Sequence, residues 1–288
     1  MTKSVAVIIP AKGRVELLQR AIDSVLCQTF KPKEIIVVDD GSDPPLESCL
    51  EPFYLSSIVL IRNHKSRNAA YSRNLGAEST TSEYLAFLDS DDFWAKEHIE
   101  HSLADMEKSA SEFSITNPNS IIPSTDYLVL AEPYTSLFTG KVDFRTSGFI
   151  IARTLFEKNG GFDADQAKHQ DWDLALRLGR EYPIVYRNAC TIFIDSHAEQ
   201  RMSGRSDVRA SLRFLGNHYK YMSDLHISSY LRFIASFCCL TGKKSGYVAS
   251  KALCGVFGVD FGSDLKSKIL WYCPLVYRAL SKTKRLLC

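Results

Sequence analysis

Three carboxylates follow a short apolar segment in the first third of this chain. Asp89, Asp91 and Asp92 come directly after the apolar run 84–88. If strand geometry continued through them, Asp89 and Asp91 would point to one side, while Ser90 and Asp92 would point elsewhere. Two carboxylates that close repel each other unless a cation lies between them. Oxygen ligands at a strand end suit Mg²⁺ or Mn²⁺ held together with substrate phosphates, so the segment predicts a metal–diphosphate site. A simpler interpretation is that Asp92 caps a helix beginning near Trp94, but three acids exceed what a cap requires.

A second acidic turn follows another apolar run. Asp39 and Asp40 come after the segment 34–38 and precede a glycine and a serine. Such a turn can serve local hydrogen bonding alone, or its carboxylates can recognise a nucleobase N–H or a ribose hydroxyl. We favour recognition, because both acidic turns follow predicted strands.

Apolar runs alternate with helical periodicity along the first hundred residues, which predicts βαβ units and a largely parallel sheet. Strands are expected at 4–10, 34–38, 57–61 and 84–88, and helices at 14–28 and 68–79. Ligands bind beyond the carboxyl ends of the strands in such sheets. The two acidic turns should therefore lie at one edge of the sheet.

The second half of the chain offers weaker candidates. Asp171 begins a predicted helix at 171–178 and is either its N-cap or a general base. Trp172 is either core or a flat wall for a sugar, and His197 alone is most simply structural. Arg14 and Arg73 are most simply solvated helix residues.

Composition favours one α/β domain with an extension. The chain has 288 residues, of which 45% are hydrophobic. No GxGxxG motif follows a predicted strand and no GxxxxGK[ST] motif occurs, which argues against dinucleotide-dependent dehydrogenases and P-loop nucleotidases. The eight cysteines have no zinc-type spacing. The start shows no signal-peptide pattern and no apolar run reaches 18 residues, so a cytoplasmic location is expected.

Charge is divided unevenly along the chain. Residues 1–200 carry 20 Lys+Arg and 29 Asp+Glu, a balance of −9, whereas residues 201–288 carry 15 and 4, a balance of +11. The segment 269–287 places aromatic and apolar residues beside Lys and Arg. It is typical of a helix on an anionic membrane surface, here the inner face of the plasma membrane. The alternative is a helical cap on the catalytic domain. No nucleic-acid motif accompanies the charge, so no nucleic-acid partner is expected.

Four ordered segments carry a family resemblance: VAVIIPAKGR, IIVVDDGS, AAYSRNLGAESTTSEYLAFLDSDDFW and GGFDADQAKHQDWDLALRL. Through them, residues 5–200 resemble family 2 glycosyltransferases of the GT-A fold. The resemblance implies a mostly parallel, Rossmann-like α/β sheet flanked by helices. The expected domain spans 1–204, with a nucleotide-binding half at 1–110 and an acceptor half at 111–204. A helical basic extension at 205–288 would follow.

The resemblance also implies roles for individual residues. Asp171 would be the catalytic base, Trp172 would contact the acceptor, and Asp91 and His197 would lie at the Mn²⁺ or Mg²⁺ ion. The residues implied to bind the nucleotide-sugar are Pro10, Arg14, Asp39, Ser42, Asn68, Asp89 and Ser90. The chain departs from the family pattern at Gln170, where a glutamate is usual before the base.

The sequence therefore predicts an inverting, metal-dependent transfer from a nucleotide-sugar, with a UDP-sugar favoured. The acceptor would be a glycan or a lipid-linked molecule in surface-polysaccharide assembly. Two alternatives stay open: a catalytically silent binding or scaffold protein, and a nucleotidyltransferase. Residues 10–14 contain a single glycine, which makes the nucleotidyltransferase the weaker of the two.

Overall fold

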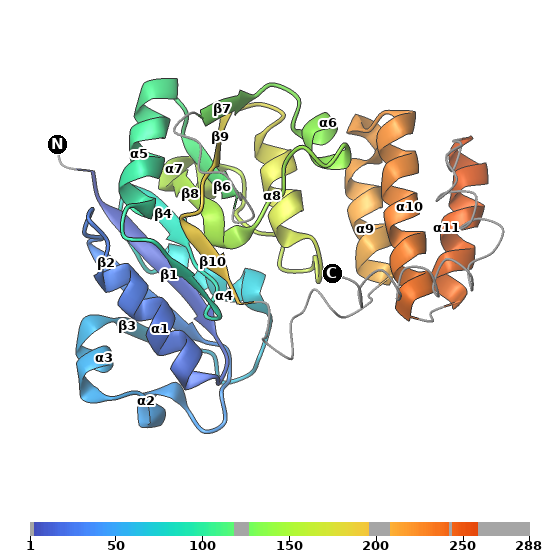
Figure 1. Ribbon diagram of the computed structural model, residues 1–288. Helices are drawn as coiled ribbons and strands as arrows, with labels where there is room; N and C mark the ends of the chain where they lie inside the picture. Colours follow the sequence, from blue (N-terminus) through green and yellow to red (C-terminus); the bar gives the residue numbers. More distant parts are fainter. Residues whose placement is uncertain (1–2, 118–126, 196–207, 242–243, 259–288) are drawn as a thin grey trace, which may run out of the picture. The chain divides into compact units, whose positions relative to one another are not determined.

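The computed structural model describes residues 3–117, 127–195, 208–241 and 244–258 (Figure 1). The chain divides into two compact units. The first comprises residues 1–133 and 142–199, and the second comprises 134–141 and 200–288. The segment 134–141, which the sequence analysis placed in the acceptor half, thus groups with the C-terminal helices. His197 and the amphipathic segment 269–287 lie outside the described residues.

An eight-stranded sheet, ordered β3-β2-β1-β4-β8-β6-β9-β7, forms the first unit. Strands β3, β2, β1 and β4 are mutually parallel, as are β6 and β9, whereas β8 and β7 run antiparallel to their neighbours. The predicted mostly parallel α/β sheet is therefore confirmed. The strands are β1 (Val5–Ala11), β2 (Glu34–Asp39), β3 (Val59–Arg62), β4 (Tyr84–Phe87), β6 (Phe113–Asn117), β7 (Tyr127–Leu130), β8 (Phe149–Ala152) and β9 (Ile184–Asn188).

Strand β1 is buried along its whole length, as expected for a parallel strand covered on both faces. It extends one residue beyond the predicted end at Pro10. The last residue of β1 that pairs with β4 is Ile8, while pairing with β2 continues to Ala11. Pro10 is tolerated near the end of the strand because one neighbour has already ended and no ladder donor is required on that side.

Helices cover both faces of the sheet. The helices α1 (Val15–Leu26) and α5 (His98–Ser109) lie on one face of the sheet and share a hydrophobic core with the β1 side chains on that face. The helices contribute Leu18, Ile22, Ile99 and Leu103 to this core. On the other face, α4 (Ala69–Glu78) approaches β1 so closely that a Cβ at Gly76 would lie 2.6 Å from the Ile8 side chain. Glycine at position 76 permits this packing.

Several local expectations differ from the structure. The helix expected near Trp94 begins at His98, and Asp92 does not cap it. Instead, β5 (Asp92–Trp94) pairs antiparallel with β10 (Ile192–Ile194). Apolar periodicity could not reveal this short pairing, because its two strands are far apart in the sequence. The remaining helices of this unit are α2 (Leu46–Cys49), α3 (Pro52–Ser57), α7 (Arg153–Lys158) and α8 (Gln170–Leu178).

The second unit is helical where it is described. Its helices are α6 (Pro133–Phe138), α9 (Val208–His218), α10 (Asp224–Thr241) and α11 (Lys244–Phe257). Tyr134 of α6 hydrogen-bonds to His218 of α9 over 2.8 Å, and the Phe138 ring lies 5.8 Å from the ring of Tyr230 in α10. Among the described residues, no helix combines the length and apolar character needed to cross a bilayer.

A buried ion pair connects α5 to the sheet. Arg187 of β9 donates through two nitrogens to the two carboxylate oxygens of Asp105, whose side chain is 1% exposed. We expect Arg187→Met to lower the free energy of unfolding by about 3–5 kcal/mol, because the buried carboxylate loses its counter-ion. Urea denaturation followed by circular dichroism measures this change.

Lys3→Met is the matched control, because Lys3 pairs with the exposed Glu107 over 2.9 Å. Its expected cost is less than about 1 kcal/mol. Equal losses of stability for the two variants would contradict the importance assigned to the buried pair.

Candidate active site

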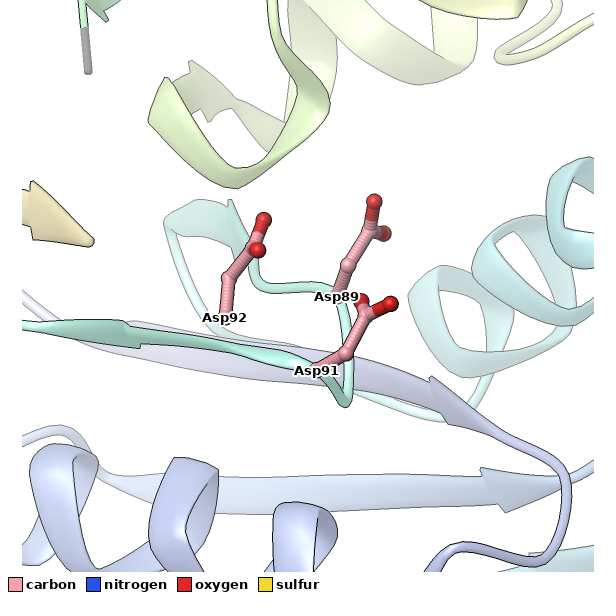
Figure 2. Close-up of side chains that lie close together, drawn as sticks. All are labelled: Asp89, Asp91 and Asp92. Carbon is pink, nitrogen blue, oxygen red and sulfur yellow. The ribbon is translucent and has the colours of Figure 1, made fainter. Parts of the chain in front are cut away.

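The acidic turn begins where β4 ends. The strand stops at Phe87, and the Asp92 N–H then donates to the Asp89 carbonyl over 3.0 Å. One carboxylate oxygen from each of Asp89, Asp91 and Asp92 lies within 4.8 Å of the others. Figure 2 shows the three side chains on the same side of this turn. The expectation that Asp92 points elsewhere was wrong, because side chains alternate only while the strand continues.

Ser147, in the 3-10 turn Thr146–Gly148, holds the acidic turn in place. Its hydroxyl donates to Asp92 over 2.6 Å and accepts from the Asp89 N–H over 3.2 Å, and its carbonyl accepts from the indole of Trp94 over 2.8 Å. A Cβ at Gly148 would lie 2.3 Å from the Thr116 carbonyl, so glycine is required beside this serine. Sequence reasoning missed Ser147, which follows a stretch without clear periodicity.

Two arginines pair with the acids. Arg14 donates to Asp91 over 3.0 Å, and Arg73 donates to Asp89 over 2.5 Å. The expectation that Arg73 is solvated was wrong, since its side chain is only 5% exposed. Gly76 and Ala77, one turn further along α4, are also buried, and these small residues were the sequence signal for a helix face packed against other elements.

The donor set fits a hard divalent cation. It consists of carboxylate oxygens alone, which Mg²⁺ and Mn²⁺ prefer. Asp89 and Asp91 each use one oxygen toward an arginine, and Asp92 uses one toward Ser147. Asp89 and Asp91 could therefore each offer a further oxygen to an ion at this turn.

The second acidic turn follows β2, which is separated from β4 by β1 in the sheet. Asp39 is buried and accepts from the N–H groups of Ser42 (2.8 Å) and Leu46 (3.2 Å) and from Arg62 (2.7 Å). The Ser42 hydroxyl in turn accepts from the Gly13 N–H over 2.8 Å, which connects this turn to the loop after β1. Asp39 thus organises its own turn, and its recognition of a nucleobase stays a prediction.

The other predicted nucleotide-binding residues surround these turns. Pro10 is buried within β1, and Ser90 is buried between the acids. Asn68 caps α4, because its side chain accepts from the Tyr71 N–H over 3.0 Å, and it donates to the Ala164 carbonyl over 2.8 Å. Nothing in these contacts assigns a ligand to Asn68.

Asp171 lies in the first turn of α8, and the N-cap position belongs to His169. The capping interpretation of Asp171 was therefore wrong. Desolvation by burial raises the pKa of Asp171 to about 6, although the Trp172 N–H and the charges of Arg145 and Arg73 lower it. A carboxylate with this pKa is ionised at neutral pH and is basic enough to accept a proton.

Arg73 connects the acidic turn to α8. Besides its bond to Asp89, it donates to the Gln170 side chain over 3.1 Å. Gln170 immediately precedes Asp171, so a single buried guanidinium contacts both Asp89 and the residue beside the candidate base. Trp172 stacks on His169, with ring centroids 4.6 Å apart.

Known proteins resemble this chain in sequence and in fold. Residues 6–166 match the family model described as glycosyl transferase family 2. AmsB, the amylovoran biosynthesis glycosyltransferase of Erwinia amylovora, is 26% identical over 231 residues, which cover 74% of this chain and 76% of that protein. WfaP of Escherichia coli, a UDP-Glc:alpha-D-GlcNAc-diphosphoundecaprenol beta-1,3-glucosyltransferase, is 34% identical over 113 residues and 39% of this chain.

The structure of S. aureus TarS 1-349 in complex with UDP-GlcNAc matches 91% of this chain and 94% of that chain. Its TM-score is 0.60 at 14% identity, which shows a shared fold. The chain spans less than half the length of several curated relatives that it matches. It spans 45% of WfaP and 23% of an uncharacterized glycosyltransferase of Rickettsia felis.

The family match covers more than half of the chain and includes both acidic turns, while Asp171 lies five residues beyond its end. The sheet and its flanking helices are those of the GT-A fold, as the sequence analysis predicted. The chain belongs to glycosyl transferase family 2.

Proposed function

We propose that this protein transfers a sugar, with inversion, from a nucleotide-diphospho-sugar to a hydroxyl group, and that the transfer requires Mn²⁺ or Mg²⁺. The observation that carries the proposal is the cluster of Asp89, Asp91 and Asp92 within 4.8 Å beyond the end of β4. Arg73 connects this cluster to the helix that bears Asp171. Donor-side acids and a candidate base are thus held by one network.

Inverting transfer requires in-line attack by the acceptor hydroxyl on the anomeric carbon. Asp171 accepts the proton of that hydroxyl, for which its pKa of about 6 is suited. Asp89 and Asp91 would hold the divalent ion, which when bound would stabilise negative charge on the leaving diphosphate. Arg73 fixes the position of Asp89 relative to α8.

The named relatives guide the choice of substrates. WfaP is named for a UDP-Glc donor and a diphosphoundecaprenol-linked acceptor, AmsB for amylovoran biosynthesis, and TarS was crystallised with UDP-GlcNAc. For this chain we therefore favour a UDP-sugar and a glycan or lipid-linked acceptor in surface-polysaccharide assembly.

A lipid-linked acceptor would place the protein at a membrane surface. Residues 201–288 carry a balance of +11, and Leu225, Val248 and Val256 are exposed apolar residues of the described helices. Basic residues beside exposed apolar side chains favour binding to anionic lipid. We propose a peripheral location on the cytoplasmic face, with the second unit as the contact.

Two other functions make different predictions. A silent scaffold would bind a partner or nucleotide without turnover. A nucleotidyltransferase would release pyrophosphate, whereas the proposed transferase releases a nucleoside diphosphate. Identification of the released product separates the transferase from the nucleotidyltransferase.

Donor binding should depend on the cation. We expect UDP-sugars to raise the melting temperature with Mn²⁺ present, because ligand at 100 times its Kd adds about 2.7 kcal/mol of stability. Asp91→Asn should abolish the Mn²⁺-dependent part of this shift, while Glu78→Gln, an exposed acid on α4, should retain it. No shift with any nucleotide-sugar in folded protein would favour the scaffold.

Asp171 should control the pH dependence of transfer. The carboxylate must be ionised to act as a base, so activity is lost as pH falls through the raised pKa of about 6. We expect kcat/KM to drop about tenfold per pH unit below 6 and to level off above it. Asp171→Asn should bind donor normally but transfer about 10²–10⁴-fold more slowly. Wild-type rates in this variant would refute the assignment of the base.

Binding to lipid should depend on charge. We expect the full chain to float with anionic vesicles and not with purely zwitterionic ones, and 0.5 M salt should weaken the association. Replacing Arg278, Lys282, Lys284 and Arg285 together by Gln should reduce flotation. Equal flotation with both kinds of vesicle, or with neither, would contradict the proposed surface.

A further inference from the structure

The ion pair between Arg14 and Asp91 lies at the exposed edge of the acidic cluster. Arg14 Nη1 donates to Asp91 Oδ2 over 3.0 Å, and the two side chains are 40% and 15% exposed. Arg14 can therefore leave this carboxylate for solvent or another anion without breaking a packed core. Arg73, the other arginine of the cluster, is buried and lacks this freedom.

The backbone at Arg14 is unusual. Arg14 has φ 50° and ψ 52°, a left-handed conformation that residues other than glycine seldom adopt. Gly13 before it also has a positive φ, and its N–H is bound by the Ser42 hydroxyl over 2.8 Å. The contact with Ser42 holds Gly13, and the side chain of the next residue, Arg14, reaches Asp91. Such a conformation at a site points to a function for the side chain.

A guanidinium and a divalent cation compete for Asp91. The oxygen that accepts from Arg14 belongs to the same carboxylate that would ligate the ion. Arg20 holds the Asp91 carbonyl over 2.8 Å and also pairs with Asp195 over 2.9 Å. Arg20 holds the backbone of Asp91, so Arg14 is the arginine that competes with a cation for its carboxylate.

We propose that Arg14 is an exchange residue, which pairs with Asp91 until a divalent cation takes that carboxylate and then pairs with the diphosphate of the donor. This inference rests on the proposed function, because it requires both a cation and a diphosphate at the cluster. It goes further by making the two ligands bind cooperatively through one side chain.

The exchange has a thermodynamic signature. A cation that binds alone competes with Arg14 for the negative charge of Asp91, whereas with diphosphate bound Arg14 pairs with the phosphate and no longer opposes the cation. Nucleotide therefore strengthens cation binding by more than direct contact between ion and phosphate explains, and the coupling is reciprocal. Removing Arg14 should tighten binding of the cation alone and reduce the coupling by the same factor.

The experiment measures Mn²⁺ binding to the full chain by electron paramagnetic resonance, with and without saturating UDP. Arg14→Gln should tighten Mn²⁺ binding in the absence of UDP by about two- to fivefold, the range expected from an exposed ion pair. It should leave Mn²⁺ affinity in the presence of UDP nearly unchanged and weaken UDP binding in the presence of Mn²⁺.

Lys12→Gln is the matched control. Lys12 is an exposed cation in the same loop, two residues away, so its removal lowers the local positive charge without touching Asp91. Mn²⁺ affinity in Lys12→Gln should stay close to that of the wild type. Equal tightening in both variants would overturn the exchange, because the effect would then be one of overall charge.

The remaining outcomes separate the exchange from the proposed function. If Arg14→Gln tightens Mn²⁺ binding equally with and without UDP, Arg14 does not move to the diphosphate and the exchange is wrong. If Arg14→Gln leaves Mn²⁺ binding unchanged, the ion pair does not oppose the cation, and the exchange is again wrong. If the wild-type chain binds no Mn²⁺ even with UDP, the proposed function itself is contradicted.

Discussion

Repulsion among Asp89, Asp91 and Asp92 is the constraint around which the site is organised. At an effective dielectric constant of about 20, two unit charges within 4.8 Å of each other repel by about 3.5 kcal/mol or more. The groups that offset this repulsion come from separate parts of the chain: Arg14 from the loop after β1, Arg73 from α4, and Ser147 from the 3-10 turn before β8. The site therefore forms only when these elements have assembled.

The parallel sheet brings these groups together. Strands β2, β1 and β4 run side by side in the same direction, so the turns that follow them share one edge. Ser42 connects the turns after β2 and β1 through the Gly13 N–H, and Asp40 connects the turn after β2 to the loop after β3 by accepting from the Arg67 N–H over 2.9 Å. Buried carboxylates that accept backbone N–H groups make the loops rigid, which limits the reorganisation needed when a ligand binds.

Much of this arrangement could be predicted from local patterns. Apolar runs identified the parallel strands, and acids at their ends identified the edge where the candidate site lies. Contacts between distant segments could not be predicted in this way. Asp92 joins the cluster because the chain turns after Phe87, and Arg73 is buried because small residues on α4 let it pack closely. Ser147 and Arg145 come from a segment whose composition gives no periodic signal.

The neutral side chain of Gln170 determines how the positive charge of Arg73 is shared near Asp171. Its neutral amide accepts one hydrogen bond from Arg73, so among the residues that the structure describes Asp89 is the only acid hydrogen-bonded to this guanidinium. A glutamate, usual in the family at this position, would divide that positive charge between two acids and add a negative charge beside Asp171. A single base change in a glutamine codon gives glutamate. Evolution can therefore adjust the pKa of the candidate base through position 170 without replacing Asp171 itself.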